Sequence, residues 1–199
     1  MYHNTPTFTV FCGSMMSSKT SKLLMMLERY KYQQKRIAVF KPTIDERYSK
    51  SEVVTHGGWS IPSYTIKTGA DILEILESLE EEPHVIAVDE AFMIQNISEV
   101  LIWLFRNGID IVVSTLDISA TGKPFNDVGK MMIWATHVEK CAAICTVCRS
   151  DAPYTYKKVV DESDFELEIE VGGAELYEPR CGIHHPGIFS VEASTKYEK

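Results

Sequence analysis

The stretch that decides the fold reads TFTVFCGSMMSSKT and covers residues 7–20. Its first six residues are apolar or β-branched and predict a buried strand that ends at Gly13. The chain from Lys19 to Gln34 lacks Gly and Pro and repeats apolar residues on one helical face, which predicts a helix. Between them, GSMMSSKT follows the phosphate-loop pattern G-x-x-x-x-G-K-[ST] at every fixed position except Ser18, where the pattern has glycine. The stretch therefore predicts a strand, a phosphate-binding loop and a helix in succession.

Such a loop binds phosphate because successive backbone N–H groups and the positive end of the helix dipole face the negative oxygens. Lys19 is expected to reach the outer phosphates and the Thr20 hydroxyl to ligate Mg²⁺. The alternative is a serine-rich turn into an ordinary helix with a solvated lysine. The candidate residues for binding phosphate and Mg²⁺ in the loop are Gly13, Ser14, Met15, Met16, Ser17, Ser18, Lys19 and Thr20.

The rest of the first half alternates short apolar runs with helical patterns. Strands are expected at 36–40, 84–88 and 110–115, and helices at 70–82 and 98–107. Apolar strands separated by helices indicate an α/β fold of the P-loop NTPase type, with a parallel sheet flanked by helices. Ligands of such sheets gather at the carboxyl ends of the strands.

Two acids, Asp89 and Glu90, directly follow the strand at 84–88. An aspartate in this position beside a phosphate loop is suited to hold Mg²⁺, directly or through water. The neighbouring glutamate points to another side and is a candidate to accept a proton from a hydroxyl nucleophile. The alternative is a strand end that carries two solvated acids.

A second pattern, Cys145-x-x-Cys148 and Cys181-x-x-His184, is typical of a zinc site. Three thiolates and one imidazole fill a tetrahedron, so no position remains for a reactive water and the site is expected to be structural. His185 is an alternative to His184, and Cys141 is an alternative ligand. Cys12 is expected to be a buried strand residue.

Composition sets the remaining expectations. The 199 residues carry 28 acids and 20 bases, a net charge of −8, which argues against a protein that grips nucleic acid. Five cysteines with no secretory signal favour a reducing, cytoplasmic location, and no apolar run is long enough to span a membrane. The change in pattern near residue 140 predicts two domains, a nucleotide-binding domain at 1–139 and a zinc-binding domain at 140–199. Strict alternation at 165–171 predicts a strand in the second.

From Phe8 to about Pro186 the chain resembles the type II thymidine kinases, small kinases with a zinc-binding lasso domain. The resemblance is carried by Met15, Ser17, Lys19 and Thr20 in the phosphate loop, Lys41–Ser49 and Val54–Gly58 after the second strand, Asp89-Glu90, Leu116-Asp117, Lys123–Phe125, Gly172–Ala174 with Tyr177, and the four zinc ligands.

The resemblance implies an activity and further site residues. ATP with Mg²⁺ would lie over the phosphate loop and beside Asp89. Glu90 would take the proton of a deoxynucleoside 5′-hydroxyl. Lys19 and Arg47 would stabilise charge on the transferred phosphoryl group. The nucleoside would contact Met15, Leu116, Phe125, Val171, Gly172, Gly173, Ala174 and Tyr177. The substrates would be ATP and thymidine, with deoxyuridine plausible because one methyl group discriminates weakly. The family also implies a homotetramer and feedback inhibition by dTTP.

Three positions depart from the family pattern. Ser18 replaces the second loop glycine, Phe92 replaces a glutamine two residues after the catalytic glutamate, and Ala120 replaces an aromatic residue of the nucleoside pocket. Phe92 and Phe125 are candidates to refill that space. These departures keep a second hypothesis open, a nucleotide-binding protein with altered nucleoside specificity or lost turnover. A zinc-ribbon module that binds nucleic acid is disfavoured, because residues 161–170 carry six acids and no base.

Overall fold

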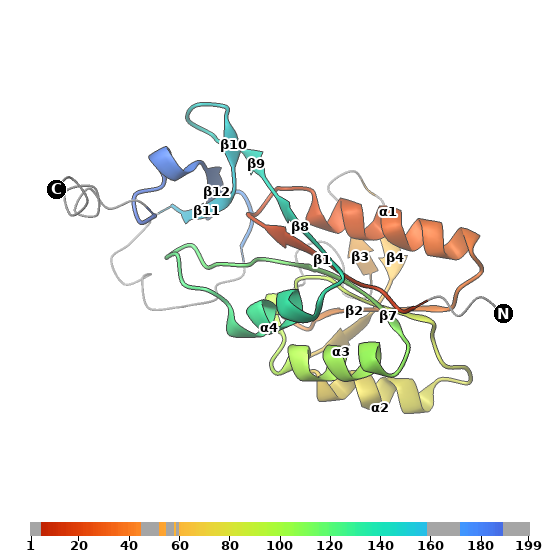
Figure 1. The fold of residues 1–199 in the computed structure, drawn as a ribbon. Coiled ribbons are helices and arrows are strands. Elements are labelled where there is room, and N and C mark those ends of the chain that lie inside the picture. The colour runs from red at the N-terminus through yellow and green to blue at the C-terminus, as the bar shows by residue number, and fades with distance from the viewer. Residues whose placement is uncertain (1–4, 45–51, 55–57, 59, 159–171, 189–199) are drawn as a thin grey trace.

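The computed structural model describes residues 5–44, 52–54, 58, 60–158 and 172–188. At its centre lies a sheet of six strands in the order β5-β2-β6-β7-β1-β8 (Figure 1). Every pairing between neighbours in this sheet is parallel. The carboxyl ends of the strands therefore share one edge. The strands are β1 (Phe8–Gly13), β2 (Ile37–Pro42), β5 (Tyr64–Ile66), β6 (Val85–Val88), β7 (Asp110–Thr115) and β8 (His137–Cys141).

Helices cover both faces of this sheet, as Figure 1 shows. Helix α1 (Lys19–Tyr32) packs on one face, where its buried leucines meet alternate residues of β1, β2, β6 and β7. The other face is covered by α2 (Ala70–Ser78), α3 (Ile97–Arg106) and α4 (Asn126–Trp134), with the short 3-10 helix η1 (Ala91–Met93) after β6. The central strands β1, β6 and β7 are buried along their whole length, as expected for a parallel sheet with both faces covered.

Smaller antiparallel pairs flank the sheet. One pairs β3 (Glu52–Val54) with β4 (Ser60–Pro62). After β8 the chain forms two ribbons, β9 (Ala143–Ile144) with β10 (Asp151–Ala152), and β11 (Tyr154–Lys157) with β12 (Tyr177–Arg180). The 3-10 helix η3 (Gly182–His184) follows β12. We call β9–β12 and η3 together the C-terminal ribbons.

The expected fold class is confirmed, and the differences are elements without an expectation, such as β5, α4 and β8, and shifted element ends. Helix α2 stops at Ser78 rather than at residue 82, and Leu79 is already extended. The three consecutive glutamates at 80–82 explain this, because negative charge at a helix C-terminus opposes the helix dipole. Strand β8 crosses residue 140 and pairs with β1, although the division into two domains at that position stays a prediction. The strand expected at 165–171 lies outside the described residues.

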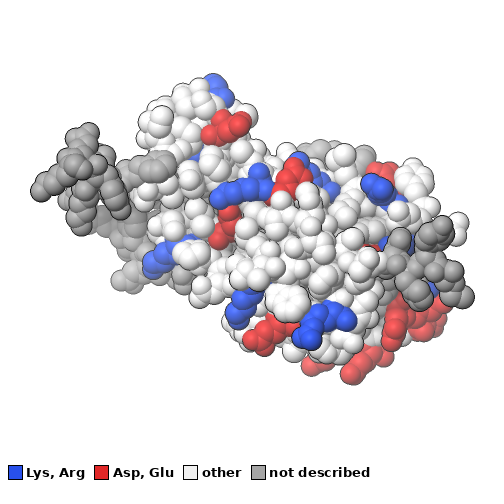
Figure 2. All heavy atoms as spheres, in the orientation of Figure 1, with Lys and Arg blue, Asp and Glu red and all other residues white. Residues whose placement is uncertain are grey.

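The surface carries mixed charge. On the face drawn in Figure 2, lysine and arginine side chains lie singly among acidic ones, and acidic side chains gather along the lower edge. Among the described residues, no helix combines the length and the apolar character that a membrane crossing requires.

Candidate functional site

The phosphate loop connects β1 to α1 at the carboxyl edge of the sheet. Gly13 opens it with a φ of +131°, and a Cβ built there would lie 2.0 Å from the carbonyl oxygen of Cys141 in the neighbouring strand β8. Only glycine fits this position. Ser18, at the end of the loop, has φ +61° and ψ +21°, the left-handed conformation that glycine adopts without steric cost. The glycine of the phosphate-loop pattern is therefore missing at a position whose backbone still favours it.

Lys19 is folded into the loop rather than extended into solvent. Its side chain is buried, and Nζ donates a hydrogen bond to the carbonyl oxygen of Ser14 at 2.5 Å. The Ser17 hydroxyl donates to the same carbonyl at 2.7 Å. Burial lowers the pKa of Lys19, whereas the negative charges of Glu90 and then Asp89 raise it. The ammonium group thus lies inside the curve of the loop and within the field of both carboxylates.

A cluster of oxygen atoms adjoins the loop where β6 ends. The Thr20 hydroxyl donates to Asp89, at 3.1 Å from Oδ1 and 3.3 Å from Oδ2, and the Ser114 hydroxyl also donates to Oδ1. Asp89 is buried, and its backbone N–H donates to the Phe40 carbonyl at 2.9 Å. A carboxylate and a hydroxyl are hard oxygen ligands, so Thr20 and Asp89 fit Mg²⁺ by donor chemistry. Ser114 was not predicted from sequence, although its place at the carboxyl end of β7 was an available signal.

Glu90 follows Asp89 but stands in different surroundings. It is partly exposed, and its φ of +50° is rare for a residue other than glycine. Strained backbone of this kind is concentrated at functional sites. The negative charge of Glu90 also raises the pKa of Lys19, more than the charge of Asp89 does. The two neighbouring acids therefore differ in burial, and both act on the pKa of the same lysine.

Two of the residues discussed for the nucleoside pocket meet each other. The rings of Phe92 and Phe125 lie 4.9 Å apart between centroids at an interplanar angle of 44°. Phe92 is held by its backbone N–H, which donates to the Thr115 hydroxyl at 3.1 Å. Leu116 is buried at the end of β7, and Ala120 is partly buried in the loop between Leu116 and Phe125. An aromatic pair thus lies beside this loop, although the family's aromatic residue at position 120 is absent.

The other residues expected at the nucleoside come from the loop and the ribbons. Tyr177 is buried at the start of β12 and pairs with Lys157 of β11, and its backbone N–H donates to the Gly173 carbonyl at 3.0 Å. Ala174 is exposed, and its carbonyl accepts from Lys158 Nζ at 2.7 Å. Met15 is partly buried in the phosphate loop, and Gly172 is buried just before Gly173. Arg47 and Val171 lie outside the described residues.

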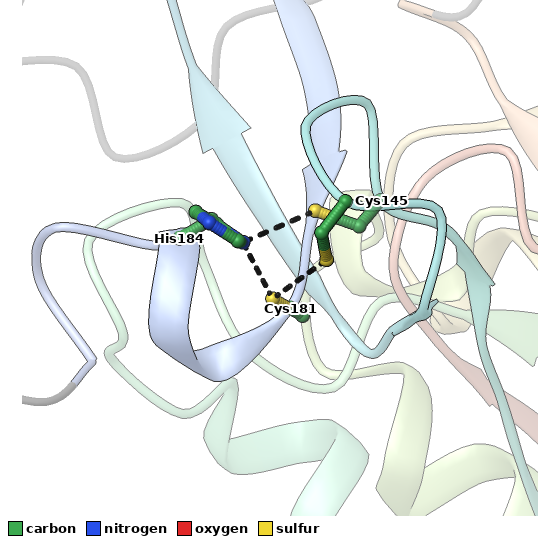
Figure 3. Close-up of side chains that lie close together, drawn as sticks. Cys145, Cys181 and His184 are labelled. Atoms are coloured by element: carbon green, nitrogen blue, oxygen red, sulfur yellow. Dashed lines mark hydrogen bonds between the residues drawn. The ribbon is translucent and has the colours of Figure 1, made fainter.

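Cysteine and histidine side chains form a compact cluster among the C-terminal ribbons, and Figure 3 labels Cys145, Cys181 and His184 of this cluster. The ligand atoms of Cys145, Cys148, Cys181 and His184 all lie within 4.8 Å of one another. The Sγ atoms of Cys148 and Cys181 are 3.7 Å apart, and His184 Nδ1 is 3.1 Å from Cys181 Sγ and 3.9 Å from Cys145 Sγ. A tetrahedron with Zn–S bonds of about 2.3 Å has S–S edges of about 3.8 Å. Both the donor set and the spacing fit a closed zinc site.

The local backbone favours thiolate at this cluster. Burial raises the pKa of the Cys145 thiol, but hydrogen bonds from the backbone N–H groups of Cys148, Cys181 and Val147 outweigh it and bring the pKa to about 6. Burial raises the pKa of Cys181 instead. Zinc ligation needs deprotonated thiols, so metal binding at this cluster would depend on pH.

The structure separates the alternative ligands from this cluster. His185 is buried elsewhere in the ribbons, with Nε2 bonded to the Thr155 carbonyl at 3.0 Å. Cys141 is buried in β8 against the face that packs on α1, and its thiol donates to the Glu139 carbonyl. Cys12 lies in the core on the opposite face, as expected, and burial raises its pKa to about 11. Thr155 was not predicted as a functional residue, and no local pattern marks it, whereas His185 was considered only as an alternative zinc ligand.

The phosphate loop and the buried acid beside it thus lie at the carboxyl edge of the parallel sheet, and the Cys₃His cluster lies among the C-terminal ribbons of the same chain. The family model described as thymidine kinase matches residues 7–185, which is most of the chain. Family membership indicates a kinase. The protein therefore belongs to the thymidine kinase family.

Proposed function

We propose that the protein transfers the γ-phosphate of ATP to the 5′-hydroxyl of thymidine, giving dTMP, and that it also accepts deoxyuridine. The observation that carries this proposal is the group of residues at one edge of the sheet: Lys19 inside the loop, Thr20 bonded to Asp89, and Glu90, which follows Asp89 and whose charge raises the pKa of Lys19. A cation, a hard-oxygen pair and a second carboxylate are the parts that phosphoryl transfer to an alcohol requires.

Each residue then has a defined task. Backbone N–H groups of residues 13–20 and the N-terminus of α1 bind the phosphate chain. Thr20 and Asp89 hold Mg²⁺, which neutralises phosphate charge when it is bound. Lys19 leaves the Ser14 carbonyl and donates to a phosphate oxygen, a stronger charge-assisted hydrogen bond. Glu90 accepts the proton of the 5′-hydroxyl as that oxygen attacks. Arg47 stabilises charge on the transferred group, as family resemblance implies.

Nucleoside recognition follows from the same resemblance. Met15, Leu116, Phe125 and Tyr177 supply the apolar walls of the pocket, and backbone groups of Val171, Gly172, Gly173 and Ala174 bind the edge of the pyrimidine. The contact between Phe92 and Phe125 supplies aromatic area that the alanine at position 120 lacks. Contacts to one methyl group are worth only about 1–3 kcal/mol, so deoxyuridine remains a substrate.

Assembly and regulation belong to the proposal as well. The protein is a cytoplasmic homotetramer that dTTP inhibits, and it takes neither nucleic acid nor membrane as a partner. Support for the assembly comes from family resemblance and from large apolar side chains on the surface of α1, where Met25 is 61% and Tyr32 83% exposed. Light scattering coupled to size-exclusion chromatography measures the subunit number directly.

The test is ATP-dependent phosphorylation of thymidine, deoxyuridine and deoxycytidine by purified protein, with radiolabelled γ-phosphate. Glu90→Gln is expected to lower kcat for thymidine by roughly 10²–10⁴-fold, the contribution of a general base, while MgATP binding persists. Glu74→Gln, a change at an exposed glutamate on α2, is the matched control and retains full activity. Tight MgATP binding without turnover on any of the three nucleosides would instead support the nucleotide-binding protein that has lost turnover.

A further inference from the structure

The first residues of the phosphate loop are held by the C-terminal ribbons. The Ser14 hydroxyl donates to the Ala152 carbonyl at 2.6 Å, and the Met15 backbone N–H donates to the Thr155 hydroxyl at 3.0 Å. These partners are 138 and 140 residues apart in the chain. The shape of the loop therefore depends on where β10 and β11 lie.

Thr155 is a buried residue of β11 with hydrogen bonds on two sides. Its hydroxyl accepts from the phosphate loop, and its carbonyl oxygen accepts from His185 Nε2 at 3.0 Å. Because a carbonyl can only accept, Nε2 carries the ring proton. His185 Nδ1 in turn accepts from the Gly187 N–H at 3.2 Å. Both ring nitrogens are thus used, and they fix the ring in one orientation.

His185 is also enclosed by aromatic rings. Tyr154 and Tyr156, on either side of Thr155, present their rings edge-on to the imidazole at centroid distances of 6.1 and 5.8 Å. Only 3% of the His185 surface is exposed. A ring held in this way has few alternative positions, so a displacement of His185 would carry β11 with it.

His185 directly follows His184, a member of the Cys₃His cluster, at the end of η3. A metal that fixes His184 therefore also fixes the backbone from which His185 projects. The connection runs from the cluster through His184 and His185 to Thr155, and from Thr155 to the Met15 N–H of the phosphate loop.

We propose that Thr155 and His185 are positioning residues that couple the metal cluster to the phosphate loop. Zinc in the cluster then raises the affinity of the loop for MgATP, and by thermodynamic reciprocity MgATP raises the affinity of the cluster for zinc by the same factor. The coupling rests on the proposed function only in that the loop binds MgATP, and it does not require thymidine to be the second substrate.

The first experiment compares Thr155→Val, which keeps the shape of the side chain and removes the hydroxyl, with Thr155→Ser, which keeps the hydroxyl. Isothermal titration calorimetry with MgATP measures binding, and metal analysis measures zinc. Thr155→Val is expected to weaken MgATP binding roughly 10-fold, the factor for one buried hydrogen bond, with zinc content unchanged. Thr155→Ser is expected to restore most of the affinity. The control is Thr146→Val, because that hydroxyl bonds to Glu178 within the ribbons.

His185 is tested with a matched pair. His185→Phe keeps an aromatic ring and loses both hydrogen bonds, whereas the side-chain amide of His185→Gln can still donate to the Thr155 carbonyl. The Phe variant is expected to raise KM for ATP with little change in kcat, and the Gln variant to recover part of the difference. If the Phe variant loses zinc while Thr155→Val binds MgATP like the wild type, the coupling is overturned.

Zinc release gives a readout that is independent of turnover. At equilibrium with a chromogenic chelator, the wild type is expected to keep more of its zinc when MgATP is present, and MgATP is expected to lose this effect in Thr155→Val. The inference would be overturned if MgATP had the same effect on zinc binding in the wild type and in Thr155→Val. It would also be overturned if Thr155→Val bound MgATP with wild-type affinity. A wild-type protein that binds no MgATP would overturn the proposed function instead, so the two failures are distinguishable.

Discussion

The carboxyl edge of the central sheet and the C-terminal ribbons acquire their shapes by different means. Around the phosphate loop, the strands are held in position by two apolar clusters, one on each face of the sheet. In the ribbons, the apolar cluster among the described residues consists of Cys145, Ala152 and Cys181. Two of these three residues are also members of the metal cluster. Hydrophobic burial organises the first region, whereas the second has to rely on its metal ligands.

Removal of the metal is expected to have the largest effect. Zinc binding contributes roughly 10–16 kcal/mol in small zinc-dependent peptides, and the ribbons have little apolar area to replace it. Chelation, or the change Cys148→Ser, is expected to abolish the content of about one zinc per chain. Hydrogen exchange is expected to show loss of amide protection in β9–β12 and retained protection in β1, β6 and β7.

The matched control for the metal is Cys141→Ser, because this thiol lies outside the cluster. It is expected to leave the zinc content unchanged. If the amides of β9–β12 stayed protected from hydrogen exchange after complete zinc removal, the ribbons would not depend on their metal ligands for their shape.

At the phosphate loop, Lys19→Met is expected to weaken MgATP binding by about 10–100-fold, because a charge-assisted hydrogen bond contributes about 1.5–3 kcal/mol. Stability is not expected to fall, since burial already lowers the pKa of this lysine and methionine removes the cost of a buried charge. Calorimetry and urea unfolding measure the two quantities. The control is Lys22→Met, a change on the same helix that removes a partly buried ion pair with Glu139 of β8, and it is expected to retain MgATP affinity. A reduced unfolding midpoint with normal binding would mean that Lys19 is structural.

Asp110 is the first residue of β7 and lies at the edge of the sheet opposite to the phosphate loop. Burial raises its pKa, but hydrogen bonds from Lys35 and Thr7 outweigh this and lower the pKa from its ordinary value of 3.8. A depressed carboxyl pKa stabilises the folded state above the pKa of the unfolded chain, and the contribution is lost as pH falls through the folded-state pKa. Asp110→Asn is therefore expected to cost about 1–2 kcal/mol at pH 7 and less near pH 3.

Urea unfolding at both pH values checks this, with Asp151→Asn, at an exposed aspartate, as control. Kinase activity is expected to be preserved in Asp110→Asn, because Asp110 begins β7 and the proposed site lies where β7 ends. If Asp110→Asn lowered the free energy of unfolding equally at pH 7 and pH 3, the depressed pKa of Asp110 would be contradicted.

Much of the first region was predictable from sequence because its signals are local. Apolar runs defined β1, β2, β6 and β7, and the spacing of loop residues defined the phosphate loop. The edge strand β8 and helix α4 were not predicted as parts of the sheet layers, since HVEKC has no apolar run and α4 contains a glycine, Gly129. The ribbons were predictable only through their cysteine spacing. The choice between His184 and His185 required the fold, because adjacent residues satisfy similar spacings.

Contacts between the regions had no sequence signal at all. The hydrogen bonds from Ser14 and Met15 to β10 and β11 join segments about 140 residues apart. The acceptors in the ribbons, Ala152 and Thr155, belong to no sequence motif. The left-handed backbone at Ser18 was likewise invisible in sequence, although the departure from glycine was not.

The smallest expected effect is a gain from Ser18→Gly. Glycine adopts the left-handed conformation without steric cost, and the Ser18 side chain makes no capping hydrogen bond that the change would remove. The free energy of unfolding is expected to rise by about 0.5–1 kcal/mol. Ser21→Gly, inside α1, is expected to lower it by about 0.5 kcal/mol. Thermal unfolding of both variants measures the difference, and a loss of stability in Ser18→Gly would contradict the backbone account.

The most direct test of the central claim is a crystal structure with a bisubstrate analogue that joins adenosine to thymidine through a phosphate chain. We expect the phosphate oxygens to accept hydrogen bonds from the backbone N–H groups of residues 13–20. The oxygen on the 5′-carbon of thymidine is expected to lie within about 3.2 Å of the Glu90 carboxylate. A thymidine 5′-oxygen remote from Glu90, or a phosphate chain bound away from the loop, would contradict the proposed site.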